Sequence, residues 1–169
     1  MTTPRRELRW EPVPVDTLVL REGDDVLGRV RRDLYGTWVE SAGGESTPAH
    51  AWRLVELGLR RDRLTLRDTT SDDATLVEDW SGHGRLLLAD GRVWGVERGA
   101  DGHVRVRDAT RGTVMDVASD RGAVSLTGAP IPPQVVLLVV TWALRARGVG
   151  AGVSVAGTRS RSRRDVLDG

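Results

Sequence analysis

The 169-residue sequence contains no cysteine, no phenylalanine, no lysine and no asparagine. Without cysteine, the chain cannot form disulfides, use a catalytic thiolate or hold a metal through cysteine ligands. All 25 basic residues are arginine, a bias that we interpret as the mark of a GC-rich bacterial genome. The formal net charge is only +1, so no global field attracts the chain to nucleic acid, and we expect no nucleic-acid partner.

An apolar leader is also missing from the start of the sequence. The opening segment MTTPRRELRWEPVP lacks the apolar core of a signal peptide, which favours a cytoplasmic location. The length suits one domain, which we place at residues 1–150. Residues 151–169 are rich in Gly, Ser and Arg and predict a disordered basic tail, with Arg159, Arg161, Arg163 and Arg164 as its cations.

Most of the chain consists of short segments with alternating or β-branched character, separated by turn residues. Asp90-Gly91 and Asp101-Gly102 are the strongest hairpin signals, because such dipeptides suit the positive φ angles of tight turns. The predicted strands are Leu8–Trp10, Thr17–Leu20, Val26–Val30, Tyr35–Glu40, Trp52–Leu57, Leu64–Asp68, Thr75–Glu78, Arg85–Leu88, Val93–Glu97, His103–Asp108, Thr113–Val117 and Ala123–Leu126.

The segment from His50 to Arg61 has two interpretations. As a helix, AWRLVELGLRR would place Trp52, Val55 and Leu59 on one stripe. We favour a strand, because Gly58 lies inside the segment and LTLRD follows as a hairpin partner.

The one long apolar run, VVLLVVTWAL from Val135 to Leu144, follows Pro132-Pro133. A helix made from it is apolar on almost every side and must be buried. The residues from Val135 to Arg147 would span roughly 20 Å as a helix, whereas the core of a membrane measures about 30 Å. We therefore predict no transmembrane span and a core helix near residues 133–147. Many short strands and one apolar helix indicate a closed antiparallel β-barrel threaded by that helix.

Three stretches together resemble a known superfamily: WRLVELGLRRDRLTLRD, GRVWGVERGADGHVRVRDATRGTVMDV and the proline-led apolar helix. Their order is similar to that of the tubby C-terminal-like superfamily, which includes tubby proteins, phospholipid scramblases and LURP-one-related proteins. The resemblance spans Leu8 to Arg147. It implies a closed β-barrel of about twelve strands that encloses a C-terminal hydrophobic α-helix. It also implies association with membranes or phosphoinositides, without an established enzyme active site.

Two differences from that superfamily concern its ligands. Tubby proteins bind phosphoinositides through a basic patch that includes lysine, and this sequence has none. Scramblases carry an acidic calcium-binding segment before the terminal helix, and here DVASDRGAVSLTGAP offers only Asp116 and Asp120. Two aspartates do not make the D-x-D-x-D-G pattern of a calcium loop, so we expect no calcium dependence and no cofactor.

The densest basic cluster of the predicted barrel consists of Arg60, Arg61 and Arg63. Arginine binds phosphate through paired hydrogen bonds, so this cluster is a candidate contact for a phospholipid head group. The alternative is a solvated turn that Asp62 partly neutralises. The same two interpretations apply to Arg29, Arg31 and Arg32.

Patterns typical of catalysis are missing. The three histidines lack metal-ligand spacing, the serines lack a GxSxG elbow, and the acid pairs Asp24-Asp25 and Asp72-Asp73 fall in turn contexts. We expect five tryptophans to fill the core, namely Trp38, Trp52, Trp80, Trp94 and Trp142. The sequence thus predicts a non-enzymatic protein whose partner is either an anionic phospholipid or another protein.

Overall fold

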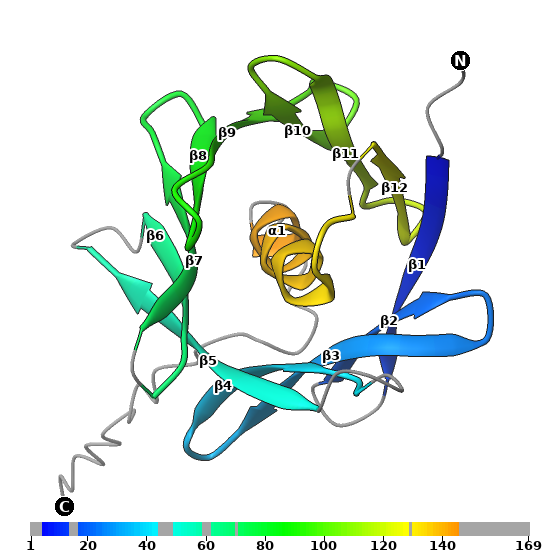
Figure 1. Cartoon of the computed structure of the whole chain (residues 1–169), viewed down its shortest axis with the longest axis vertical. Helices are drawn as coiled ribbons and strands as arrows, with labels where there is room; N and C mark the ends of the chain where they lie inside the picture. Colours follow the sequence, from blue (N-terminus) through cyan, green and yellow to red (C-terminus); the bar gives the residue numbers. More distant parts are fainter. Residues whose placement is uncertain are drawn as a thin grey trace, which may run out of the picture.

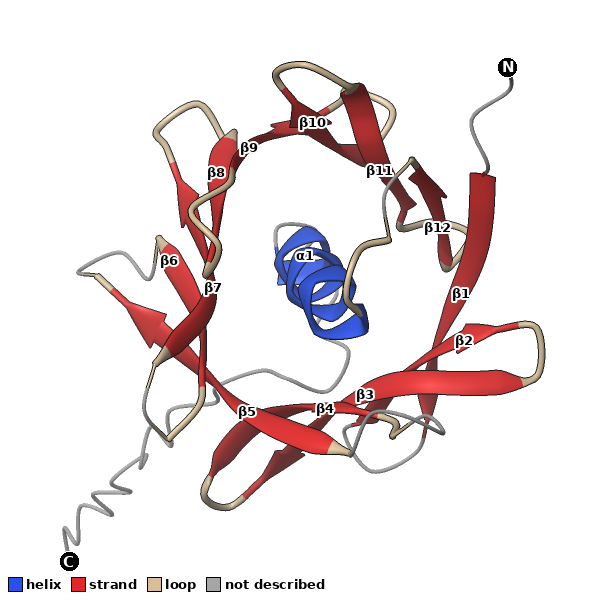
Figure 2. Cartoon of the chain, viewed as in Figure 1, coloured by secondary structure: helices blue, strands red, loops and turns tan. Residues whose placement is uncertain are grey.

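The computed structural model describes residues 5–13, 17–43, 49–58, 62–69, 71–128 and 130–145. Within them, antiparallel strands form a closed barrel, and one helix follows the last strand. Figures 1 and 2 show this helix in the centre of the ring of strands. The elements are β1 (Arg5–Val13), β2 (Thr17–Glu22), β3 (Asp25–Asp33), β4 (Gly36–Ser41), β5 (His50–Leu57), β6 (Arg63–Arg67), β7 (Asp72–Glu78), β8 (Gly84–Leu88), β9 (Val93–Arg98), β10 (His103–Asp108), β11 (Gly112–Ala118), β12 (Ala123–Thr127) and α1 (Pro133–Arg145).

The predicted closed barrel with a C-terminal helix is confirmed. Each strand pairs with the next one in sequence, and β1 closes the ring by pairing with β12, where Leu8 lies opposite Val124. The ambiguous segment at His50 is a strand, β5, and it forms a hairpin with β6 as favoured. Ring closure pairs β1 and β12, which would otherwise be the edges of an open sheet.

Side chains along each strand alternate between the interior and the exterior of the barrel. In β9, Trp94 and Val96 are buried while Val93 is exposed. In β10, Val104 and Val106 are likewise buried between more exposed neighbours. The inward side chains of the strands therefore form one apolar core around α1.

The helix α1 begins at Pro133, where a missing N–H costs little, and ends at Arg145, whose cation complements the carbonyl end. Arg147, the predicted end, lies outside the described residues. The buried residues of α1 are Val135, Val136, Leu137, Leu138, Val139, Val140, Trp142, Ala143 and Leu144. Gly28 of β3 lets the barrel wall approach the helix, because a Cβ there would lie 3.1 Å from Cδ1 of Leu137.

Within the described ranges, no helix has both the length and the apolar character that crossing a membrane would require.

Antiparallel neighbours place the strand connections alternately at the two ends of the barrel. Gln134, at the start of α1, contacts Asp73 near the start of β7, and Trp142 contacts Glu78 at the end of β7. We call the end at which α1 begins the proximal end and the end at which it finishes the distal end. The β3–β4, β5–β6 and β7–β8 connections are therefore distal, and the β2–β3, β8–β9 and β10–β11 connections are proximal.

Two aromatic residues lie elsewhere than predicted. Trp80 was expected in the core but is 85% exposed in the turn between β7 and β8, so that prediction is wrong. Tyr35 was expected to begin a strand but lies in the β3–β4 turn, because β4 begins at Gly36. Both residues lie in connections beyond the ends of the strands, where side chains no longer have a barrel interior to face. Of the other predicted core tryptophans, Trp52, Trp94 and Trp142 are buried and Trp38 is half-buried.

Candidate functional site

The most exposed large apolar side chains among the described residues gather at the distal end. Leu34 is 99% exposed and Tyr35 is 79% exposed at the β3–β4 turn, and Trp80 occupies the β7–β8 turn. Burial of apolar surface is favourable, so three such side chains in solvent need a reason other than stability of the barrel. We call Leu34, Tyr35 and Trp80 the distal tips.

The β3–β4 turn is held by one carboxylate. Oδ1 of Asp33 accepts hydrogen bonds from the backbone N–H groups of Tyr35, at 2.8 Å, and Gly36, at 3.1 Å. Its other oxygen lies 2.8 Å from Nη1 of Arg31. The Tyr35 N–H, then the Trp38 indole and Arg31, hold the pKa of Asp33 below its ordinary value. Because the backbone is fixed from inside the turn, Leu34 and Tyr35 point away from it.

The β7–β8 turn uses the same device. Oδ1 of Asp79 accepts hydrogen bonds from the hydroxyl of Ser81, from its backbone N–H at 2.9 Å, and from the N–H of His83 at 3.2 Å. These bonds, with the Ser81 hydroxyl as the largest cause, hold the pKa of Asp79 below its ordinary value. The ionised carboxylate therefore fixes the backbone on both sides of Trp80 near neutral pH.

Arginines lie just behind the distal tips. Arg63, one of the three predicted head-group contacts, is the first residue of β6 and faces outward, while Arg60 and Arg61 lie outside the described residues. Val77 of β7 pairs with Arg63 on one side and with Arg85 of β8 on the other. The guanidinium of neither arginine forms a hydrogen bond or ion pair with another residue in the described part of the chain. Arg85 was not among the predicted contacts, although its place in the outward set of GRLLL was open to prediction.

Inside the barrel, the distal end carries a polar layer that sequence analysis missed. Nε1 of Trp142 donates a hydrogen bond to Glu78 at 3.0 Å, and the guanidinium of Arg98 stacks over the Trp142 ring at 4.4 Å. Nη2 of Arg145 lies 3.7 Å from Glu56. The alternation of inward and outward residues could have predicted this layer. Glu56 lies two residues after the inward Leu54 of β5, and Glu78 lies two residues after the inward Leu76 of β7.

The remaining predicted candidates are engaged in pairs. Arg29 and Arg31 both bind Glu40, so the structure does not bring them to the distal arginines. Nδ1 of His103 lies 2.8 Å from Asp116, and Nε2 of His50 lies 3.3 Å from Asp68. Within the described part of the chain, no three His, Asp or Glu side chains are grouped in a way that would hold a metal ion.

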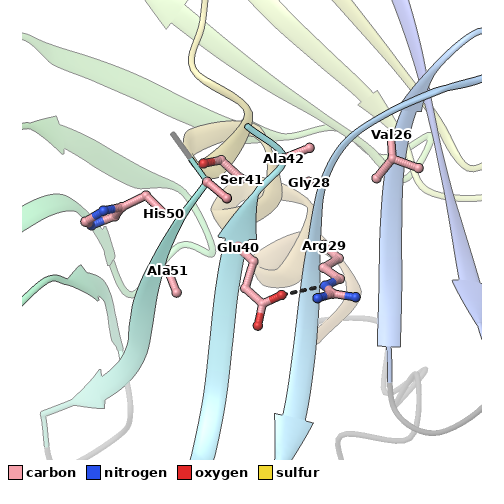
Figure 3. Close-up of a pocket in the computed structure, with 9 residues that line it drawn as sticks. Val26, Gly28, Arg29, Glu40, Ser41, Ala42, His50 and Ala51 are labelled. Carbon is pink, nitrogen blue, oxygen red and sulfur yellow. Dashed lines mark hydrogen bonds and ion pairs between the residues drawn. The ribbon is translucent and has the colours of Figure 1, made fainter. Parts of the chain in front are cut away.

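A shallow pocket of about 340 Å³ opens near the proximal end, lined by Val26, Gly28, Arg29, Glu40, Ser41, Ala42, Ala49, His50 and Ala51. Figure 3 shows that its polar groups do not converge. Arg29 and Glu40 point at each other, and His50 points away from Ser41. The pocket therefore lacks a set of free polar groups aimed at one ligand atom, and the distal tips with their arginines remain the better candidate.

No protein-family model matches the chain, and the searches of curated proteins and of solved structures gave no match either.

Proposed function

We propose that this protein is a non-catalytic module that attaches to the surface of an anionic membrane through its distal end. One observation carries the proposal: the side chains of Leu34, Tyr35 and Trp80 lie at one end of the barrel and are each at least 79% exposed to solvent. Tryptophan and tyrosine favour the boundary between water and lipid, because one part of each ring is apolar and another is polar. The tubby-like resemblance agrees with this function.

The arginines behind the tips support anionic lipid over neutral lipid. Arg63 is the first residue of β6 and Arg85 is the second residue of β8, and both strands begin at the distal end. Lipid phosphates would therefore meet these two side chains when the tips enter the interface. A guanidinium binds a phosphate through two parallel hydrogen bonds. Each such cation contributes about 1 kcal/mol at an anionic surface, and salt screens this attraction.

The test is sedimentation with vesicles of phosphatidylcholine alone or with one third phosphatidylglycerol. The wild type is expected to bind the anionic vesicles at low salt and to release them as salt rises. Leu34→Ser combined with Trp80→Ser is expected to lower binding at least tenfold. Arg63→Gln with Arg85→Gln should remove the preference for anionic vesicles.

Val26→Ser is the matched control, because Val26 is an exposed apolar residue at the proximal end. It is expected to bind as the wild type does. A tip variant that binds as well as the wild type, or a wild type that ignores anionic vesicles at low salt, would refute the proposal.

A further inference from the structure

The carboxylates that hold the two distal turns differ in their counter-charges. In the β3–β4 turn, Asp33 lies 2.8 Å from Nη1 of Arg31, whose permanent cation balances it. In the β7–β8 turn, the side chain of Asp79 has Ser81 and His83 as its partners in the described part of the chain, and no arginine. The counter-charge of the Trp80 turn therefore depends on a histidine.

His83 closes the β7–β8 turn with its backbone and is exposed. Its carbonyl oxygen accepts a hydrogen bond from the N–H of Asp79 at 2.8 Å. Its ring reaches the neighbouring strand, because Nδ1 accepts a hydrogen bond from the backbone N–H of Arg98 at 3.4 Å. A ring nitrogen accepts a hydrogen bond only when it carries no proton. The contact with β9 therefore belongs to the neutral imidazole, and protonation of Nδ1 breaks it.

The charge of this turn depends on the state of His83. The segment DWSGH, residues 79–83, contains one carboxylate and no arginine. The pKa of Asp79 is held below its ordinary value of 3.8, mainly by the Ser81 hydroxyl, so this carboxylate stays ionised at pH 5 and above. With a neutral His83, the turn presents a negative charge beside Trp80. A protonated His83 cancels that charge.

The other charged groups around His83 do not titrate in the same range. Glu97 and Arg98 lie on the adjoining strand β9, and Arg85 lies two residues further along β8. Glu97 pairs with Arg107 at 3.3 Å, and the guanidinium of Arg98 lies inside the barrel. Carboxylates and guanidinium groups ordinarily keep their charge between pH 5 and 8, whereas histidine changes its own there.

We propose that His83 makes membrane attachment sensitive to pH, with acid strengthening the binding of the distal end to anionic lipid. Protonation removes the net negative charge of the Trp80 turn and releases the imidazole from Arg98, so that its N–H groups can reach lipid phosphates. This regulation rests on the proposed function, because it acts on the same distal tips. One added positive charge at an anionic surface raises affinity about fivefold.

The test is sedimentation at low salt, at pH 7.5 and pH 5.5, with vesicles of phosphatidylcholine and one third phosphatidylglycerol. The phosphodiester of phosphatidylglycerol stays ionised over this range. The wild type is expected to bind about fivefold more tightly at pH 5.5, and vesicles of phosphatidylcholine alone should show no such gain.

Two variants fix the charge of residue 83. His83→Gln should bind at both pH values as the wild type does at pH 7.5. His83→Arg should bind at both pH values as the wild type does at pH 5.5. Both keep the backbone bonds to Asp79, and thermal unfolding at each pH checks that they are folded.

His103→Gln is the matched control. His103 begins β10 at the distal end, and its ring pairs with Asp116 at 2.8 Å on the barrel wall instead of joining a tip turn. This variant is expected to keep the pH response of the wild type. Loss of the response in His103→Gln would assign the titration to the wall and overturn the role of His83.

The same measurement separates the switch from the membrane proposal. A wild type that binds anionic vesicles equally at both pH values would overturn the switch and leave the proposed function standing. A His83→Gln variant that still gains affinity in acid would also overturn it. Absence of binding at both pH values would refute the proposed function and the switch together.

Discussion

The two ends of the barrel differ in what they do with apolar and charged side chains. At the proximal end, Gly28 lets the wall approach α1 closely, and the exposed apolar residue Val26 keeps more than half of its surface covered. At the distal end, apolar residues point into solvent while charged ones line the interior around Trp142. The distal end thus departs in both directions from the usual burial of apolar side chains and exposure of charged ones. Such departures are typical of contact surfaces.

Removal of α1 is expected to have the largest effect on both ends of the barrel, because the helix runs from one end to the other through the core. A chain that lacks residues 132–169 loses the nine buried side chains of α1 and leaves the inward face of every strand without a partner. We expect no cooperative unfolding transition by circular dichroism. A chain that ends at residue 150 is the control and should unfold cooperatively. A folded product without the helix would contradict the assignment of α1 to the core.

Packing at the proximal half is tested by Gly28→Ala. The added Cβ would lie 2.6 Å from the carbonyl oxygen of Glu40, so the wall must shift against α1. We expect a loss of about 2 kcal/mol in the free energy of unfolding, measured with urea. Gly95→Ala adds the same methyl group in open space and should gain roughly 0.5 kcal/mol. Equal effects would show that the proximal half is no tighter than the outer surface.

The distal interior is tested by Glu78→Ala. This change leaves the buried N–H of Trp142 without its acceptor, and we expect a loss of about 1–2 kcal/mol. Glu97→Ala removes an exposed carboxylate that pairs with Arg107 on the outside, and it should cost roughly 0.5 kcal/mol or less. If the two variants unfolded alike in urea, the interior polar layer would have no structural role.

Low pH is expected to destabilise the turns at the two ends of the barrel to different extents. At the proximal end, the hydroxyl and N–H of Thr110, then the N–H of Arg111 and the indole of Trp94, hold the pKa of Asp108 far below its ordinary value of 3.8. A lowered carboxyl pKa adds stability above about pH 4 that is lost as pH falls through the folded value. We expect Asp108→Asn to flatten the fall in Tm below pH 4 more than Asp79→Asn does. Parallel Tm profiles for the two variants would be evidence against this difference.

The smallest expected change in stability belongs to the distal tips. Leu34→Ser with Trp80→Ser removes side chains that contact solvent, so the free energy of unfolding should change by less than about 0.5 kcal/mol. Differential scanning calorimetry can measure this. A larger loss would mean that the tips contribute to the core, and their effect on vesicle binding could then not be read as loss of a contact.

The sequence could predict the fold because strand alternation and the apolar run both report burial. The Val104 and Val106 pattern gave a half-buried strand, and the run around Val135 gave an enclosed helix. The distal site was less open to prediction. The residue type of Trp80 suggested the core, whereas its position after Asp79 in a turn decided its exposure. The pairing of Arg63 with Arg85 across Val77 depends on strand register, which no local pattern specifies.

Ring closure between β1 and β12 has a consequence for how the chain is made. These strands are joined by Arg5–Thr127 and neighbouring pairs, and α1 follows both of them in the chain. During synthesis, the earlier strands have no helix on which to bury their inward faces until the ribosome has passed Arg145. Contacts so distant in sequence form slowly, and unfilled sheets are prone to aggregate meanwhile. The inward faces of the strands therefore stay exposed to aggregation for as long as translation takes to move past Arg145.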